Sequence, residues 1–255
     1  MGGGGLQMRR FFINTDEISG RTVKISGSDA GHIINVLRLG AGDIISLCDG
    51  KGHEAEAVIR ETCRGVVTAD LRNDMIFDET GSNIVDITLF QAVPKGDKMD
   101  FIVRKAVELG VNRVVPIVTR RTVVKIDNFA DYPKTNRWKR IAVEASKQCG
   151  RKVLPVVDAP ASFETCMEMA GKMDLCIIPY EKTERTGLKE VLREYSPAGK
   201  STGVIIGPEG GFEPAEIETA VSRGLKPVSL GRNVLRTETA GMVAVSILMY
   251  EAGEI

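Results

Sequence analysis

The first part of the chain alternates short apolar runs with polar turns. RRFFI, RTVKI, DIISLCD, HEAEAVIR and GVVTADL are separated by Gly, Asp and Asn. Runs of this length and spacing predict strands, and together they predict a small β-barrel over residues 8–72. One segment, SDAGHIINVLRL, instead has apolar residues at helical spacing. We expect a helix there, with Ser28 or Asp29 as its N-cap.

The pattern changes after a polar stretch, RNDMIFDETGSN, which predicts a linker over residues 73–83. From residue 84 onward, apolar runs such as IVDITLFQAV, RVVPIV, LCIIPYE and GVIIGPEGG alternate with helical segments. The helical segments include a long basic helix, a helix at 213–222 and a closing helix from about Glu238 to Tyr250. Strands that alternate with helices are typical of a mostly parallel sheet covered on both faces. We therefore expect an α/β fold over residues 84–255.

Ligands of such sheets bind beyond the carboxyl ends of the strands, where three loops are candidates: IIPYE, GPEGGF and LGRNVLRTETAG. In VIIGPEGGFEPA, a strand ends in a glycine-rich loop that lets backbone approach a ligand closely. Glu209 stands where a phosphate-binding loop has Lys followed by Ser or Thr, and a carboxylate repels phosphate. The loop therefore predicts a ligand without phosphate, although a glycine-rich loop can also serve only as a turn.

The third loop concentrates polar groups. Arg232 and Arg236 are four residues apart, and the Thr-Glu-Thr run that follows can cap the closing helix. Either arginine could contact a substrate or could form a salt bridge or a contact at the helix start. The closing helix carries Val243, Ile247 and Leu248, which could form a subunit contact or ordinary core.

Composition excludes several classes of protein. The 255 residues contain no apolar run of membrane-spanning length, and the start lacks a signal-peptide pattern, so we expect a soluble cytoplasmic protein. MGGGGLQ (residues 1–7) reads as a leader before a natural start at Met8. Five cysteines form no CxxC pair and the chain has two histidines, so we expect no metal site and reduced, buried thiols.

A formal net charge of zero hides one basic segment. Residues 119–152 contain ten Lys or Arg against three acids, which favours a polyanionic partner. The predicted helix in this segment has Arg140 on one face, and its apolar face carries Trp138, Ile141, Ala142, Ala145 and Cys149. A solvated surface would also explain the charge, and His32 is often a capping or core residue. The candidates for contacts with RNA are Arg9, Arg10, His32, Arg38, Arg120, Arg121, Arg140, Gln148 and Arg151.

These motifs together resemble the 16S ribosomal RNA (uracil-N3)-methyltransferases of the SPOUT superfamily. The matching stretches are HIINVLRL, KGDKMDFIVRKAVELGVNRVVPIVTRR, EASKQCGR, IIGPEGGFEPAE and LGRNVLRTETA. The resemblance implies a PUA-like RNA-binding barrel followed by a SPOUT domain with a trefoil knot. It also implies a homodimer that binds S-adenosylmethionine and modifies 16S ribosomal RNA, alone or within the assembled small subunit.

The resemblance also implies roles for the loop residues. S-adenosylmethionine carries a positive sulfonium and ammonium and no phosphate, so a nearby carboxylate is tolerated or favoured. The expected cofactor-binding residues are Ile178, Pro179, Gly207, Glu209, Gly210, Gly211, Leu230, Gly231, Asn233, Leu235, Thr237, Thr239 and Ala240. For the reaction we expect Arg236 first, and then Arg232, to contact the substrate oxygens. The proton acceptor stays open among Glu209, Glu181, Glu238 and solvent.

Three other functions remain open at this point. One is a SPOUT methyltransferase with a different RNA target, and another is a non-catalytic RNA-binding protein that retained the fold. A nucleotide-binding dehydrogenase is a more distant alternative, because no GxGxxG follows a first strand with an acidic residue about 20 positions on.

Overall fold

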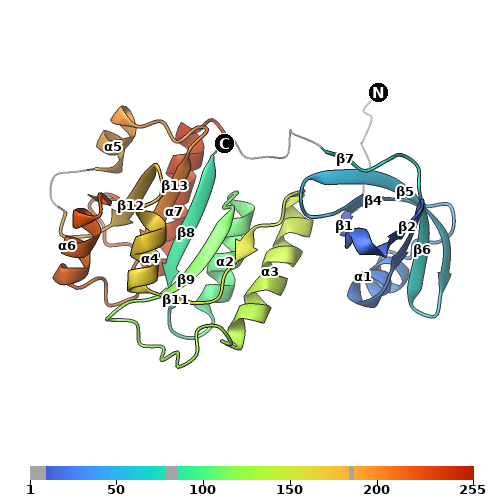
Figure 1. Cartoon of the computed structure of the whole chain (residues 1–255), viewed down its shortest axis with the longest axis horizontal. Coiled ribbons are helices and arrows are strands. Elements are labelled where there is room, and N and C mark those ends of the chain that lie inside the picture. Colours follow the sequence, from blue (N-terminus) through green and yellow to red (C-terminus); the bar gives the residue numbers. More distant parts are fainter. Residues whose placement is uncertain (1–9, 78–84, 184–186) are drawn as a thin grey trace. The chain divides into compact units, whose positions relative to one another are not determined.

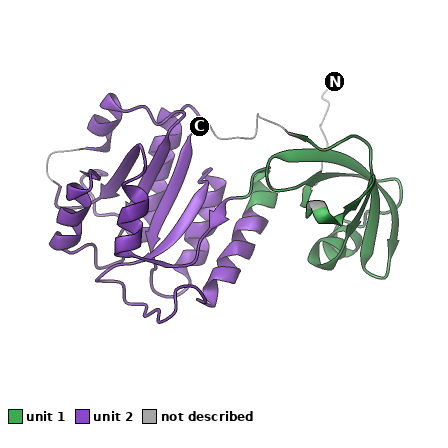
Figure 2. Cartoon of the chain, viewed as in Figure 1, with its two compact units in different colours: residues 1–82, 146–154 green, residues 83–145, 155–255 purple. Residues whose placement is uncertain are grey.

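A computed structural model describes residues 10–77, 85–183 and 187–255. The chain forms two compact units (Figure 2), of which the first comprises residues 1–82 and 146–154 and the second residues 83–145 and 155–255. The predicted leader and Arg9 lie outside the described residues. None of the helices in the described ranges is long and apolar enough to span a membrane.

The first unit is a curled, mostly antiparallel sheet (Figure 1). Its strands follow the order β1-β4-β5-β6-β3-β2, with β1 parallel to β4 and β7 paired with β5. Inward side chains such as Phe11, Ile33 and Leu47 form its buried core. The strands are β1 (Arg10–Phe12), β2 (Ile18–Ser19), β3 (Thr22–Ile25), β4 (Ile44–Cys48), β5 (His53–Cys63), β6 (Val66–Leu71) and β7 (Ile76–Phe77), with a 3-10 turn, η1, at Thr15–Glu17.

The helical segment of this unit differs from the prediction. It consists of α1 (Gly27–Gly31) and a following π-helical turn, η2 (His32–Val36), and its N-cap is Ser26 rather than Ser28 or Asp29. The helix starts earlier because Gly27, at φ +68°, turns the chain directly out of β3. The short strand β7 lies inside the stretch predicted as a linker.

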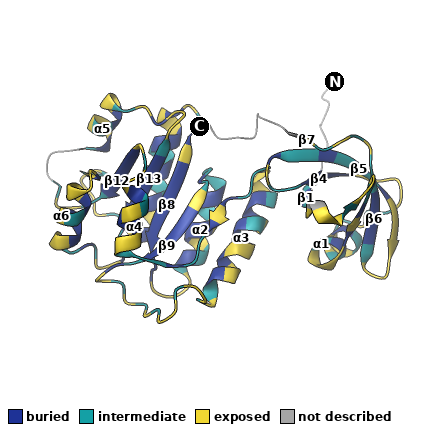
Figure 3. Ribbon diagram, in the orientation of Figure 1, coloured by how far each residue is buried: buried dark blue, intermediate teal, exposed yellow. Residues whose placement is uncertain are grey.

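The second unit is built on a parallel sheet with the strand order β10-β9-β8-β13-β12-β14, and β11 pairs with β9. Its central strands are buried on both faces (Figure 3), as their nearly continuous apolar runs predict. The strands are β8 (Asp86–Ala92), β9 (Arg113–Val118), β10 (Val156–Val157), β11 (Ala161–Ser162), β12 (Leu175–Pro179), β13 (Ser201–Ile206) and β14 (Lys226–Val228).

Helices cover both faces of this sheet. Ile87 and Leu89 of β8 pack in one core with α2, α3, α5 and α7, whereas Phe90 and Ala92 pack in a second core with α4 and α6. Successive strand residues point to opposite faces, so one strand serves both cores. The helices are α2 (Lys98–Glu108), α3 (Lys134–Cys149), α4 (Phe163–Ala170), α5 (Leu188–Glu194), α6 (Pro214–Ser222) and α7 (Thr237–Glu251).

Two predictions about buried residues are wrong. Cys63 and Cys149 are exposed, whereas Cys48, Cys166 and Cys176 are buried as expected. The predicted apolar face of α3 is correct at Trp138, Ala142 and Ala145, but Ser146 rather than Cys149 continues it. The end of α3 belongs to the first unit, so its last turn packs against different elements from its first turns.

Two further details of the helices were not predicted. Helices α4 and α5 were not foreseen, because their segments of 8 and 7 residues are too short for a helical period to stand out in the sequence. In the closing helix α7, Leu248 is fully buried in the core, whereas Val243 and Ile247 are only partly buried.

Candidate functional site

Three loops of the second unit meet at one pocket. They follow the carboxyl ends of β12, β13 and β14, which are neighbours in the sheet order β13-β12-β14. The main pocket has a volume of about 630 Å³, and a smaller one of about 110 Å³ adjoins it. Pro179, Glu181, Val234, Leu235 and Ala240 line both. The three loops that the sequence singled out therefore form a single site.

The glycine-rich loop after β13 makes one wall of the main pocket. A turn closes it, with the Gly211 N–H donating to the Pro208 carbonyl at 2.9 Å. Gly211 has φ +67°, a conformation that favours glycine. A Cβ on Gly207 would lie 2.9 Å from the Phe212 ring, so the ring packs where a side chain would stand. The loop thus needs glycine at these two positions and presents backbone to the pocket.

Thr237 ties this loop to the start of α7. Its hydroxyl donates to the Gly207 carbonyl at 2.6 Å and accepts from the Gln91 side-chain amide at 2.9 Å. Thr237 and Gln91 are both buried, so each hydrogen bond lost would leave a polar group unsatisfied. The residue preceding α7, Arg236, is its N-cap, and no side-chain hydrogen bond caps the helix. The Thr-Glu-Thr run therefore joins two loops rather than capping α7 as predicted.

Four charged side chains gather beside the Gly207–Phe212 loop. The Lys98 ammonium lies 3.0 Å from Glu209 Oε1 and 3.7 Å from Glu238 Oε2, and Arg236 is close enough to repel it. The hydrogen bond to Glu209 is the main cause that raises the pKa of Lys98. Burial raises the pKa of Glu209, but backbone hydrogen bonds and Lys98 outweigh it, so the pKa is lowered. Glu209 is therefore an ion-paired carboxylate, which makes it a poor proton acceptor.

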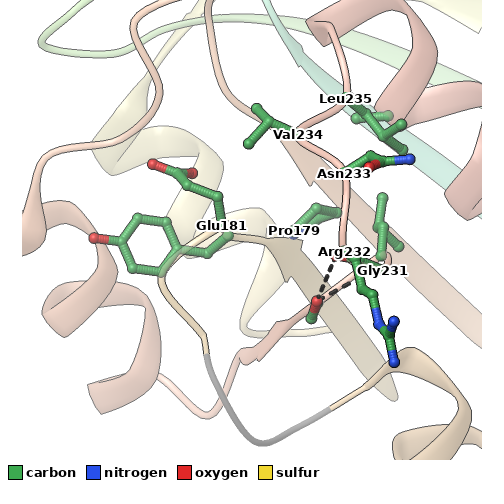
Figure 4. Close-up of a pocket in the computed structure, with 11 residues that line it drawn as sticks. Pro179, Glu181, Gly231, Arg232, Asn233, Val234 and Leu235 are labelled. Carbon is green, nitrogen blue, oxygen red and sulfur yellow. Dashed lines mark hydrogen bonds between the residues drawn. The ribbon is translucent and has the colours of Figure 1, made fainter.

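The loop after β14 is far more exposed. Ser229 and Gly231 exchange two hydrogen bonds of 3.3 Å, one from the Ser229 hydroxyl and one from the Gly231 N–H. Val234 is 82% exposed although it is apolar. Figure 4 shows the Arg232 guanidinium extending away from the side of the pocket on which Val234 and the Glu181 carboxylate lie. Arg232 lines only the smaller pocket, and no ion pair joins it to another of the described residues.

Most of the predicted cofactor residues line these pockets. Pro179, Leu235 and Ala240 line both, while Gly207, Glu209, Gly210, Gly211 and Thr237 line the larger one and Leu230, Gly231 and Asn233 the smaller. Two predicted residues line neither. Ile178 is buried in the core of the sheet, and Thr239 is exposed on the first turn of α7. The roles assigned to all of these residues remain predictions.

Several pocket residues were not predicted, and Lys98 is the most informative. It lies in the stretch KGDKMD, which carried part of the family resemblance, but no single feature of that stretch marks it. Lys98 contacts Glu209, which is 111 positions further along the chain, so no local pattern could reveal the pair. Phe212 and Val234 were also missed, because apolar residues in a loop give no chemical signal. The described residues contain no cluster of His, Cys, Asp and Glu that could hold a metal ion.

The predicted RNA-binding residues have different surroundings. Arg10 binds Glu54 at 3.0 Å and also donates to the Gly150 carbonyl, both within the first unit. Arg121 donates to the Gly210 carbonyl at 2.9 Å and thus supports the glycine-rich loop. Burial lowers the pKa of Arg151, since it disfavours the charged form. The remaining candidates described as exposed are His32, Arg38, Arg120, Arg140 and Gln148.

Family models match both units. Residues 81–249 match the RNA methyltransferase domain, and residues 25–64 match the RNA methyltransferase PUA domain. The chain belongs to this family of RNA methyltransferases. Its sequence is 31% identical over 253 residues to Ribosomal RNA small subunit methyltransferase E of Bacillus subtilis, covering 96% of this chain and 97% of that protein.

Two solved structures resemble this methyltransferase closely. A putative methyltransferase from Legionella pneumophila, in complex with S-adenosylmethionine, has a TM-score of 0.83 and 31% identity, covering 96% of this chain and 98% of the other. A Ribosomal RNA small subunit methyltransferase E from Neisseria gonorrhoeae, bound to S-adenosylmethionine, has a TM-score of 0.80 and 30% identity, covering 95% and 97%. The predicted α/β class with an N-terminal PUA-like unit is confirmed, while the trefoil knot remains a prediction.

Proposed function

We propose that this chain methylates N3 of a uridine in 16S ribosomal RNA and uses S-adenosylmethionine as the methyl donor. The observation that supports this most is the convergence of the three loops on one pocket that combines bare glycine backbone with Arg236. Relatives of nearly full length are named for methylation of small-subunit ribosomal RNA, and two similar structures contain S-adenosylmethionine.

The residues of the pocket fit this cofactor. Its volume of about 630 Å³ is in the range for ligands of this size. Gly207 and Gly211 allow backbone groups to approach the bound cofactor closely, and Leu235 and Ala240 offer apolar surface. Carboxylates near the pocket, which would repel a phosphate, are compatible with a positively charged ligand. Bound here, S-adenosylmethionine supplies an electrophilic methyl group.

Arg236 is the residue we assign to the substrate. Uracil N3 must lose its proton to become a good nucleophile, and negative charge then develops on the neighbouring oxygens. Arg236 lines the larger pocket from a position fixed by the start of α7, so its guanidinium can stabilise that charge. Glu209 is paired with Lys98, so we assign it to the electrostatics of the site rather than to proton removal. Arg232 lines only the smaller pocket and takes a secondary role.

The wider assignments are proposals as well. Residues 8–72 serve as the RNA-binding domain, residues 73–83 as the linker and residues 84–255 as the catalytic domain. The methyltransferase works as a homodimer in the cytoplasm, on free 16S ribosomal RNA or on the small subunit. The partly buried Val243 and Ile247 remain candidates for the dimer contact, whereas Leu248 is committed to the core.

Reverse transcription through 16S ribosomal RNA tests the proposal. A methyl group on N3 blocks the pairing edge of uracil, so RNA from cells with the gene is expected to stop the polymerase at one uridine. RNA from cells without the gene should be read through, and a plasmid copy should restore the stop. A plasmid copy with Arg236→Ala serves as the matched control and should fail to restore it. Identical profiles with and without the gene would refute the proposed reaction.

A further inference from the structure

Glu181 occupies a central place between the two pockets. It follows β12, lines both cavities and is exposed. Its carboxylate oxygens lie 3.6 and 3.9 Å from the place where a Cβ on Gly211 would stand. The side chain thus extends from the loop after β12 to the glycine-rich loop after β13. In Figure 4 it points to the same side as Val234 and away from Arg232.

The three carboxylates near the larger pocket differ in their partners. Glu209 lies 3.0 Å from the Lys98 ammonium, and Glu238 lies 3.7 Å from it. No ion pair joins Glu181 to a cation among the described residues, and the nearby Arg232 extends in the opposite direction. Lys98 therefore compensates the charge of Glu209 and Glu238 but leaves the charge of Glu181 facing the pocket.

An uncompensated carboxylate in a pocket attracts a cationic ligand more strongly than a neutral ligand of the same shape. S-adenosylmethionine carries a positive sulfonium, whereas S-adenosylhomocysteine, the product after methyl transfer, has a neutral thioether at the same position. The ammonium and carboxylate of the amino-acid part are the same in both. A charge placed near the sulfur therefore separates the two ligands, and a charge placed elsewhere in the pocket does not.

We propose that the Glu181 carboxylate faces the sulfur of the bound cofactor and thereby makes the site selective for the charged methyl donor over its neutral product. This inference rests on the proposed function, because it assumes that the pocket binds S-adenosylmethionine. It assigns Glu181 a binding role and not that of the proton acceptor. A pocket with this selectivity releases the spent cofactor more readily and is less inhibited by it.

Calorimetry with three ligands tests the assignment without requiring turnover. The ligands are S-adenosylmethionine, S-adenosylhomocysteine and sinefungin, which has a protonated amine in place of the methylsulfonium. Wild-type protein is expected to bind the two cationic ligands more tightly than the neutral one. Glu181→Gln should reduce that preference on the order of fivefold, the upper range for a solvent-exposed ion pair, and leave affinity for S-adenosylhomocysteine nearly unchanged. Glu218→Gln, the same change on the exposed face of α6, should leave all three affinities unaltered.

The outcomes separate this inference from the function on which it rests. An equal loss for all three ligands in Glu181→Gln would overturn it, because the carboxylate would then contact a part that they share. Unchanged affinities in that variant would overturn it too. If wild-type protein bound none of the ligands, the proposed function itself would be refuted, and the inference about Glu181 would fall with it. A circular-dichroism melt of each variant checks that the protein is folded before the affinities are compared.

Discussion

The two walls of the pocket differ in how firmly the fold holds them. On the Gly207–Phe212 side, buried Thr237 and Gln91 join the loop to α7 and β8, and Lys98 pairs with Glu209. On the Gly231–Val234 side, the residues are exposed and Val234 is 82% exposed. A wall fixed by buried hydrogen bonds keeps its shape before the ligand arrives, whereas an exposed loop can adjust on binding. We therefore expect the fixed wall to carry the chemistry and the exposed wall to contribute mainly contacts with the ligand.

The largest effect is expected from a substitution of Arg236, at the start of α7, compared with the same substitution of Arg232 in the exposed loop. Arg236→Ala should lower the single-turnover rate of methyl transfer about 100-fold, the usual cost of losing one group that stabilises developing charge. Cofactor affinity should stay within a few-fold of wild type, because the proposed contact is with uracil. Arg232→Ala is the matched comparison and should lower the rate only a few-fold. Equal losses in the two variants would remove the distinction between the walls.

Thr237→Val tests what holds the fixed wall in place. The change leaves the Gly207 carbonyl and the Gln91 amide without their partner, so the free energy of unfolding should fall by about 2 kcal/mol. Thr239→Val makes the same change two residues along on an exposed site and should cost well under 1 kcal/mol. Urea denaturation of both variants measures the difference. Similar values would show that the Thr237 hydrogen bonds do not secure the loop.

Gly211→Val tests whether the fixed wall binds the cofactor. A β-branched residue at φ +67° is strained by about 1–3 kcal/mol, and relief of that strain would move the backbone that faces the pocket. Affinity for S-adenosylmethionine should fall about tenfold or more, a greater loss than the fall in thermal stability implies. Gly224→Val is the control, since Gly224 also has a positive φ, +84°, but lines neither pocket. Unchanged affinity in folded Gly211→Val would exclude this loop from the site.

The smallest effect is a pH dependence of the Lys98–Glu209 pair. The pKa of Glu209 is lowered in the folded state, so the charged form stabilises the fold above the ordinary pKa of 4.5. That contribution is lost as the pH falls below 4.5 and through the lowered folded pKa. Wild type should therefore melt slightly higher than Glu209→Gln at pH 7, and the difference should shrink as the pH falls below 4.5. A melting difference that is constant with pH would mean that the pair does not stabilise the fold.

The sequence predicted the strands and the loops better than it predicted the contacts between side chains far apart in the chain. The strands of the parallel sheet were predictable because an apolar run buried on both faces is distinctive, as in β8 and β13. The three loops were found because glycine, proline and arginine follow those strands directly. A signal of this kind is local: it needs only neighbouring residues.

What the sequence could not predict depends on distant partners. Lys98 meets Glu209, and Gln91 meets Thr237 across 146 positions, and no local pattern encodes either pair. The same holds for the ion pair of Arg10 with Glu54, while the contact of Arg10 with RNA stays a prediction. Cys149 was misplaced because α3 ends in a different unit from the one in which it begins. Charge and periodicity predict whether a side chain is exposed or buried, whereas the fold determines which residue it contacts.

The identity of the methylated atom is the most direct test of the central claim. Purified protein would be incubated with S-adenosylmethionine carrying a labelled methyl group and with small subunits or 16S ribosomal RNA from cells that lack the gene. The RNA would then be digested to nucleosides and separated by chromatography with mass detection. The account predicts label in 3-methyluridine, and almost none with Arg236→Ala. Label in a ribose-methylated or carbon-methylated nucleoside, or no transfer by wild-type protein that binds the cofactor, would contradict it.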